Sequence, residues 1–157
     1  MLVTRQTIQW KPLLFFFLYT FILAGIGTLL GNPTTEGLIQ PPLAPPDWLF
    51  PVVWTILYSL MSYAAYLVFI SGDIARGPAL RLYLLQVIVN IVWPLFFFRL
   101  EWRLFAFFWL LLLLALVILT AKRFYLISPT AGLLLIPYIV WLFIAGYLNL
   151  SIYLLNR

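Results

Sequence analysis

Five stretches without a charged residue divide this chain, and each is close to the length of a membrane-spanning helix. They cover about residues 13–30, 48–70, 82–98, 104–121 and 130–155. A helix needs ~20 mainly apolar residues to cross a bilayer. Apolar residues make up 66% of the chain and charged residues 8%, so a soluble fold of this size could not bury its apolar surface. We predict an all-α integral membrane protein, in which residues 1–157 form one bundle of five transmembrane helices.

The first stretch has a second interpretation as a cleaved signal peptide, because Arg5 and Lys11 precede it. Its length exceeds the ~7–15 residues of a typical signal-peptide core, and no clear A-x-A cleavage site follows it. We therefore expect it to remain as a spanning helix.

The basic residues are divided unequally between the two sides of the predicted membrane bundle. The side of the N-terminus has six, namely Arg5, Lys11, Arg76, Arg81, Lys122 and Arg123. The other side has three, namely Arg99, Arg103 and Arg157. Basic loops stay in the cytoplasm, so we predict a multi-pass protein of a bacterial cell membrane with a cytoplasmic N-terminus. Anionic lipid facing these residues accounts for the net charge of +5, and no nucleic acid partner is expected.

The residue inventory excludes several kinds of site. The chain has no cysteine and no histidine, which removes disulfides, thiolate metal sites, the commonest metal ligand and the usual general base. The axial haem ligands that remain are the N-terminal amine, the tyrosines and the methionines Met1 and Met61, so a redox haem is not expected. The carboxylates are scattered over predicted loops, as Glu36, Asp47, Asp73 and Glu101. We predict no metal site and no permanently bound cofactor.

A proline-rich segment, QPPLAPP at residues 40–46, lies directly before the second stretch. Proline fixes φ and has no N–H, so this segment is expected to be extended and stiff. The loop 31–47 is longer than most unstructured loops in compact domains, which favours a rigid lid over a plain connector. We predict that Asp47 caps the second helix and that Pro51 lies in its first turn.

Aromatic and polar residues share helix faces on three of the predicted helices. By helical spacing these are Trp54 and Tyr58 on the second, Asn90, Trp93 and Phe97 on the third, and Trp141, Ala145 and Leu148 with Asn149 beside them on the fifth. Their convergence predicts a ligand pocket beneath Pro45 and Pro46. The alternative is that the rings pack the bundle and the asparagines hold helices together.

Residues 41–68 resemble a signature of the TspO/MBR family, the tryptophan-rich sensory or translocator proteins. The pattern PxxxPPxWxFxxxWxxLY appears as Pro41, Pro45, Pro46, Trp48, Phe50, Trp54, Leu57 and Tyr58. The third stretch has the family's Asn-x-x-Trp as Asn90 and Trp93, with Gln86 upstream. The fifth has PYxxWxxxAxxLN as Pro137, Tyr138, Trp141, Ala145, Leu148 and Asn149. The match extends over essentially the whole chain in order.

This resemblance implies a five-helix membrane protein, commonly a homodimer, whose pocket is closed by the first loop. The family binds porphyrins such as protoporphyrin IX, sterols and synthetic isoquinoline-type ligands. By position, the pocket would be lined by Trp54, Tyr58, Asn90, Trp141, Ala145 and Leu148. It implies a protein that senses, regulates or transports tetrapyrroles and other lipophiles. In some bacterial members, tryptophans that match Trp54 and Trp141 are tied to light- and oxygen-dependent porphyrin breakdown, so a porphyrin-degrading enzyme is the alternative.

The chain departs from the family pattern at Thr34-Thr35, where an aromatic pair is usual, at Gln40, where lysine is usual, and at Pro94, which we expect to kink the third helix. Two short motifs have alternative interpretations. Leu150, Tyr153 and Arg157 fit a proposed cholesterol pattern or form an interfacial anchor. Gly27-x₃-Gly31 fits a contact between the helices of a dimer.

Overall fold

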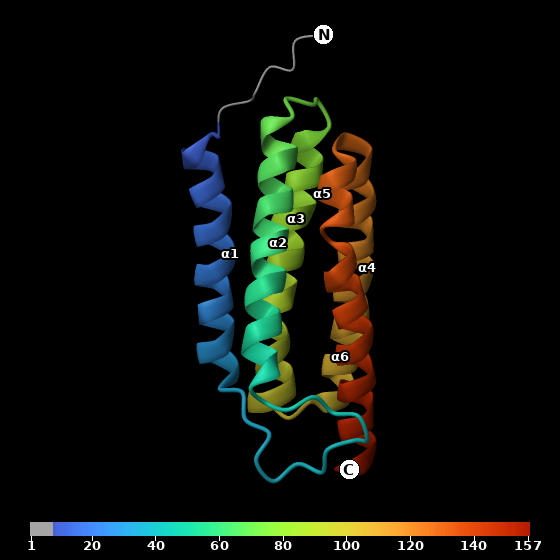
Figure 1. Cartoon of the computed structure of the whole chain (residues 1–157). Coiled ribbons are helices and arrows are strands. Elements are labelled where there is room, and N and C mark those ends of the chain that lie inside the picture. The colour runs from blue at the N-terminus through green and yellow to red at the C-terminus, as the bar shows by residue number, and fades with distance from the viewer. Residues whose placement is uncertain (1–7) are drawn as a thin grey trace.

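The computed structural model describes residues 8–157, which form a bundle of helices running side by side (Figure 1). The helices are α1 (Trp10–Gly31), α2 (Leu49–Ile70), α3 (Arg76–Pro94), α4 (Arg103–Ile127), α5 (Pro129–Leu133) and α6 (Ile136–Leu155), with a π-helical turn η1 (Leu95–Arg99). Five spans are long and apolar enough to cross a membrane, with α3 and η1 forming one and α5 and α6 another. The predicted five-helix membrane bundle is confirmed.

Three of the spans extend past the charged residues that bounded the prediction. The first span begins at Trp10, before Lys11, rather than at residue 13. The third begins at Arg76 rather than at residue 82, and the fourth continues to Ile127 rather than to residue 121. Arginine and lysine can lie inside a helix end because their long side chains reach the membrane surface. Arg76, for example, donates to the backbone carbonyl of Phe69 at 2.8 Å. A search for charge-free segments therefore gives spans that are too short.

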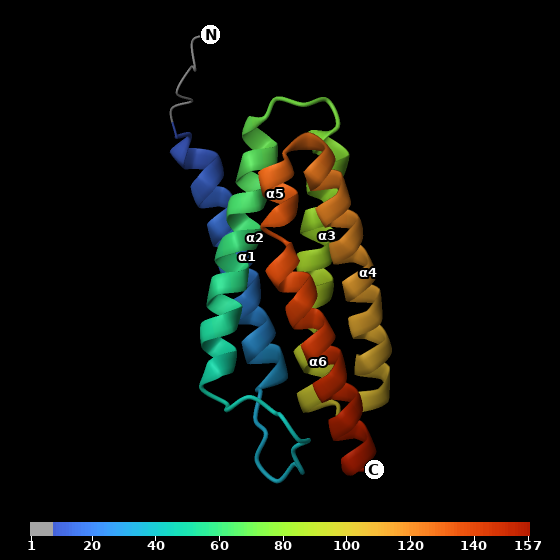
Figure 2. The same cartoon turned by 45° about the vertical axis from the view of Figure 1, so that its right-hand side comes forward.

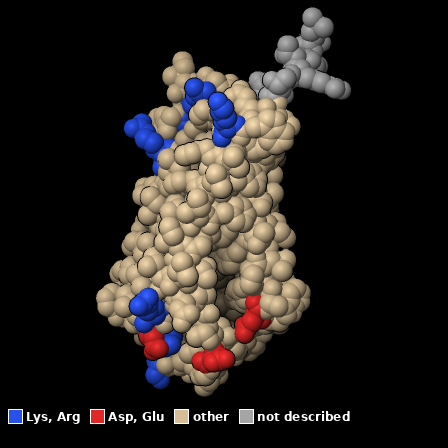
Figure 3. Space-filling view, turned by 90° about the vertical axis from the view of Figure 1, so that its left-hand side faces the viewer, with Lys and Arg blue, Asp and Glu red and all other residues tan. Residues whose placement is uncertain are grey.

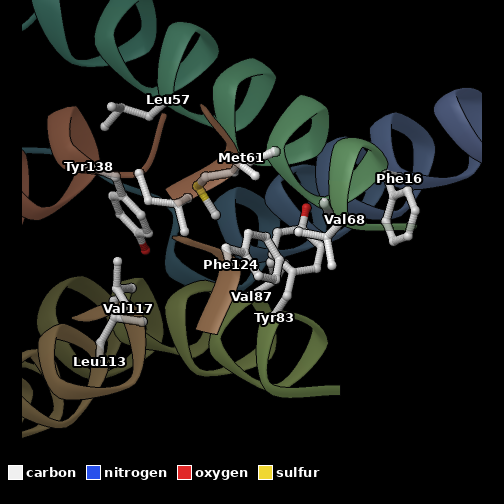
Figure 4. Packing of buried hydrophobic residues seen from close by; sticks show 14 of the residues in the cluster. Phe16, Leu57, Met61, Val68, Tyr83, Val87, Leu113, Val117, Phe124 and Tyr138 are labelled. Atoms are coloured by element: carbon white, nitrogen blue, oxygen red, sulfur yellow. The ribbon is translucent and has the colours of Figure 1, made fainter. Parts of the chain in front are cut away.

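The core of the bundle is formed where α1, α2, α3, α4 and α6 face one another (Figure 4). Met61 and Tyr83 are fully buried there, and Phe124 of α4 stacks against Tyr83 with ring centroids 6.0 Å apart. The hydroxyl of Thr20 on α1 also hydrogen-bonds that of Tyr83. Large apolar side chains such as Leu29 and Leu126 remain exposed on the outer faces, as lipid-facing residues do in a membrane bundle.

Glycines bring α1 close to α3. A Cβ on Gly27 would lie 2.9 Å from the carbonyl oxygen of Ile91, and one on Gly31 would clash with Cβ of Pro94. Both positions are buried within the chain. The Gly27-x₃-Gly31 motif therefore makes a helix contact inside this bundle, and its interpretation as a contact between two chains is wrong.

Prolines interrupt the third and fifth spans. After Pro94, α3 continues as η1, because proline has no N–H with which to continue the α-helical ladder. The fifth span was expected to be continuous, but it divides into α5 and α6 at Leu134 and Leu135. Pro137 explains the break, because its ring would clash with the carbonyl four residues earlier and it donates no hydrogen bond. Ser128 caps α5 by accepting from the Ala131 N–H.

The loop 32–48 crosses the end of the bundle from α1 to the C-terminal end of α6 and returns to α2 (Figures 1 and 2). It is fastened to α6 and the residue after it. The Ile39 N–H donates to Oδ1 of Asn156 at 2.8 Å, the Asn156 amide donates back to the Ile39 carbonyl at 3.0 Å, and the Tyr147 hydroxyl donates to the Pro42 carbonyl at 2.8 Å. The loop is therefore a fixed cover over this end of the bundle.

The predicted capping role of Asp47 is wrong. Helix α2 begins at Leu49 with Trp48 at the capping position and no side-chain cap. The Asp47 carboxylate instead accepts a hydrogen bond from the Thr35 hydroxyl at 3.0 Å. That bond joins the two ends of the loop, so a residue typical of a helix start serves to close the loop.

Candidate ligand-binding pocket

A pocket of about 550 Å³ lies beneath the loop 32–48, between the helices. Its walls come from α1, α2, α3, η1, α4 and α6, and residues of the loop border its mouth. Figure 3 shows a hollow at this end of the molecule with an acidic residue at its edge. Drug-sized ligands bind in cavities of ~300–1,000 Å³ that have mainly apolar and aromatic walls, and this pocket is of that kind.

The wall formed by α2 and α6 consists of rings in contact. Trp54 and Tyr58 stack with centroids 5.2 Å apart, and the Tyr138 ring meets Trp54 edge-on at 6.0 Å. One turn nearer the mouth, Phe50 and Trp141 meet edge-on at 5.7 Å. The rings hold one another in place, so Trp54, Tyr58 and Trp141 face the pocket from a preformed wall.

The wall formed by α3 and η1 combines stacked rings with buried amides. Trp93 and Phe97 stack with centroids 5.0 Å apart, and both border the pocket. Asn90 donates to the Tyr138 hydroxyl at 2.6 Å. The Trp93 indole donates to Asn149 at 3.0 Å, and Asn149 donates in turn to the carbonyl of Arg103 at 2.8 Å.

These bonds link α3 to α6 and α6 to the start of α4. Asn90 and Asn149 therefore hold helices together, as the alternative interpretation of the asparagines stated, and both also border the pocket. An amide that is already paired within the bundle stabilises the shape of the wall. We infer that the two asparagines keep the stacked rings in register.

On α6 the pocket is bordered by Ala145 and Leu148 as well as by Trp141 and Asn149. Ala145 has the smallest side chain of this group, and Leu148 is buried. A larger side chain at 145 would project into the space that the pocket occupies. The face that the helical spacing assigned to the pocket is thus the one that borders it.

Comparison with known proteins identifies the family. The sequence profile of the TspO/MBR family matches residues 12–155. The chain belongs to the TspO/MBR family. A tryptophan-rich protein TspO of Chlorobaculum tepidum is 37% identical over 123 residues, which are 76% of this chain and 77% of the relative. Protein CrtK of Rhodobacter capsulatus is 36% identical over 125 residues, 77% of each chain. The translocator protein of Bos taurus is 34% identical over 139 residues, 82% of each chain.

In this member of the TspO/MBR family, the two prolines expected above the pocket do not border it. Their neighbours Ala44 and Asp47 do, together with Thr34, Thr35, Glu36 and Gln40 earlier in the loop. The Pro46 carbonyl accepts from the Leu49 N–H at 2.9 Å. Pro45 and Pro46 therefore form the stiff approach to α2, and Ala44 and Asp47 on either side of them border the pocket.

Sequence reasoning missed the contributions of α1 and α4. From α1 the pocket is bordered by Ala24, Gly27 and Thr28, and from α4 by Leu110 and Leu113. The small residues of α1 fall on one helix face, a signal that could have placed α1 beside a cavity. Helix α4 is apolar on all sides, so no sequence pattern distinguishes the face toward the pocket from the face toward lipid.

The residues of the proposed sterol motif lie outside this pocket. Tyr153 and Arg157 border a separate hollow of about 290 Å³ with Arg103 and Glu101, and Leu150 borders neither cavity. Arg103 pairs with Glu101 at 3.5 Å. Among residues 8–157, no group of three carboxylate, histidine or cysteine side chains could hold a metal ion.

Proposed function

We propose that the pocket binds tetrapyrroles, such as protoporphyrin IX, and other lipophilic molecules, such as sterols, and that the protein acts in the sensing, regulation or transport of these ligands. The observation that carries the proposal is the cavity of about 550 Å³ with stacked aromatic walls inside a membrane bundle. A flat apolar ring system can stack on indole and phenol rings in this setting. The ligand is exchangeable, and no permanently bound cofactor is proposed.

The fixed loop supports a closed binding site. Its hydrogen bonds to Tyr147 and Asn156 hold it across the end of the bundle, and its residues border the mouth of the pocket. A ligand in the pocket would be shielded from the aqueous phase while its apolar body remained among the helices. This arrangement suits a molecule that is sparingly soluble in water.

Degradation of the bound porphyrin is the second candidate function. Trp54 and Trp141 both border the pocket, Trp54 from α2 and Trp141 from α6. A bound ring system would therefore contact redox-active indoles from two helices. In this reading Trp54 and Trp141 are the residues that take part in the reaction.

One titration distinguishes the two candidates. Purified protein is titrated with protoporphyrin IX and followed by absorbance, first in the dark and then under illumination in air. Saturable binding with a stable Soret band supports binding alone, whereas bleaching with a new chromophore that requires Trp54 and Trp141 supports degradation. Lack of saturable binding in the dark would contradict both.

We also propose that the loop 32–48 faces away from the cytoplasm, in a bacterial cell membrane, and that two copies form a homodimer. At the end of the bundle opposite this loop lie Lys11, Arg76, Arg81, Lys122 and Arg123. Basic residues concentrate on the cytoplasmic side of membrane proteins. The exposed apolar side chains of the outer faces are available to lipid or to a second copy.

A further inference from the structure

A charged group on a ligand limits how that ligand can be oriented in this pocket. The inner walls are mainly rings and aliphatic side chains of membrane-spanning helices, and the amides of Asn90 and Asn149 there are already paired within the bundle. Burying an ionised group against such walls is costly. The mouth beneath the loop 32–48 is the end at which water and polar groups are available. Any charged substituent of a bound ligand must therefore face the residues of the mouth.

Of the described residues that border the pocket, only Glu36 and Asp47 carry charge, and both are acidic. Both lie on the loop and are exposed, and Asp47 is held in place by the Thr35 hydroxyl at 3.0 Å. Within residues 8–157, no lysine or arginine borders the pocket. The mouth consequently presents negative charge to whatever group a ligand places there.

Three arginines lie at the same end of the bundle, but their surroundings differ. Arg103 pairs with Glu101 at 3.5 Å, and both Arg103 and Arg157 border the separate hollow of about 290 Å³. Arg99 is exposed at the end of η1 and does not border the pocket, although Phe97 and Phe98 before it do. None of these three cations borders the pocket.

We propose that Glu36 and Asp47 make this pocket select its ligands by charge, favouring a flat lipophile with a basic amine at its loop-facing end over the same lipophile with carboxylates there. A neutral ligand ranks between the two. The proposal rests on the proposed function, because it assumes that the pocket binds flat lipophiles. It adds the chemical class of ligand that the mouth accepts.

The size of the effect follows from Coulomb's law. Two unit charges about 4 Å apart in water change an affinity by roughly fivefold. Exposed charges are screened over ~8 Å at physiological salt, so the discrimination should weaken as salt is added. Contacts between apolar surfaces would not weaken in this way.

The test uses three forms of one ring system: protoporphyrin IX with its two propionates, its dimethyl ester, and its bis-amide with a terminal amine on each arm. Binding to the intact protein in detergent is measured by tryptophan fluorescence quenching at low and physiological salt. We expect affinity to fall from the amine to the ester to the dicarboxylate, with a total spread of about tenfold or more at low salt. The double variant Glu36→Gln and Asp47→Asn should reduce this spread to within about threefold.

Asp73→Asn is the matched control, because Asp73 lies in the turn between α2 and α3 at the opposite end of the bundle (Figure 1). This variant should keep the full spread. The ester serves as the internal reference, and its unchanged affinity in the double variant would show that the pocket is intact. If the double variant loses the ester as well, the single variant Glu36→Gln, which leaves the Thr35–Asp47 bond in place, should still reduce the spread.

Equal affinities of the wild type for all three forms, or a spread that survives in Glu36→Gln and in the double variant, would overturn the selection by charge while leaving ligand binding in place. No saturable binding of any form would overturn the proposed function, and the charge selection with it.

Discussion

The two halves of the bundle are made from the same kinds of residue, yet one is solid and the other hollow. In the half away from the loop 32–48, small buried residues such as Ala64, Ala79 and Ala131 let the helices approach, and Tyr83 and Phe124 fill the space between them. In the half beneath the loop, the large rings stack along the walls, and a cavity of about 550 Å³ remains.

The difference shows that a cavity in a membrane protein is made by arrangement rather than by composition. The rings of the hollow half stack against neighbours in the same wall, as Trp93 does on Phe97 and Trp54 on Tyr58. Hydrogen bonds of Asn90 and Asn149 then fix the distance between walls. Because these contacts keep the helices apart, space for a ligand remains between them.

The largest expected effect is an all-or-none difference in reporter activity between the two ends of the bundle, which tests how the protein is oriented in the membrane. If the basic end is cytoplasmic, a reporter that is active only in the cytoplasm should be inactive when fused after Arg157 and active when inserted in the turn between α2 and α3. Reporter activity in both fusions, measured in a bacterial host, tests the orientation. A cytoplasmic signal after Arg157 would contradict it.

A large change in stability is expected in the solid half. Cβ of a residue at 132 would lie 2.5 Å from Cβ of Tyr125 and 2.7 Å from its Cα. Gly132→Val should therefore force α5 away from α4 and lower the free energy of unfolding by about 3 kcal/mol, seen as a lower midpoint of thermal unfolding in detergent.

The control for this variant is Gly25→Ala on α1, where an added Cβ meets nothing within 4 Å. Its thermal midpoint should stay within the error of the wild type or rise slightly. A stable Gly132→Val protein would mean that the solid half tolerates separation of its helices, and the contrast between the halves would weaken.

In the hollow half, a comparable addition should affect binding and leave the fold intact. Ala145→Thr adds a branched side chain at the pocket wall, and overpacking of about 1–3 kcal/mol corresponds to roughly ten- to a hundredfold in porphyrin affinity. Circular dichroism should show unchanged helix content. Ala115→Thr, on the exposed face of α4, is the control and should bind porphyrin as the wild type does. Equal affinities of the two variants would show that the side chain at 145 does not contact the bound ligand.

The spans and much of the pocket wall can be predicted from the sequence, and the limits of that prediction have physical causes. The five spans follow from hydropathy, and the ring faces of α2, α3 and α6 follow from helical spacing. The sequence analysis missed the division of the fifth span into α5 and α6 at Leu134 and Leu135. Pro137 signals this break, but an unbroken apolar segment predicts one continuous helix. Asp47 closes the loop through a hydrogen bond from Thr35, which lies twelve residues earlier. Loop residues have no regular spacing from which such a pair could be predicted.

A smaller effect is expected when the loop is released from α6. Tyr147→Phe with Asn156→Ala removes the bonds to Pro42 and Ile39. Each lost bond contributes about 0.5–1.5 kcal/mol, so the ligand off-rate, measured by competition in stopped flow, should rise roughly tenfold or more. Tyr125→Phe is the control, since Tyr125 is exposed near the end of α4 away from the loop. An unchanged off-rate would mean that the loop does not gate the pocket.

The smallest effect is expected from the prolines themselves. Pro45 and Pro46 do not border the pocket, so replacing both with glycine should change no ligand contact. It should loosen the approach to α2 by about 0.4–1 kcal/mol per residue through chain entropy, and raise the off-rate several-fold, less than the double variant of Tyr147 and Asn156. A larger rise than in that variant would show that the stiffness of the loop, rather than its bonds to α6, keeps the hollow half closed.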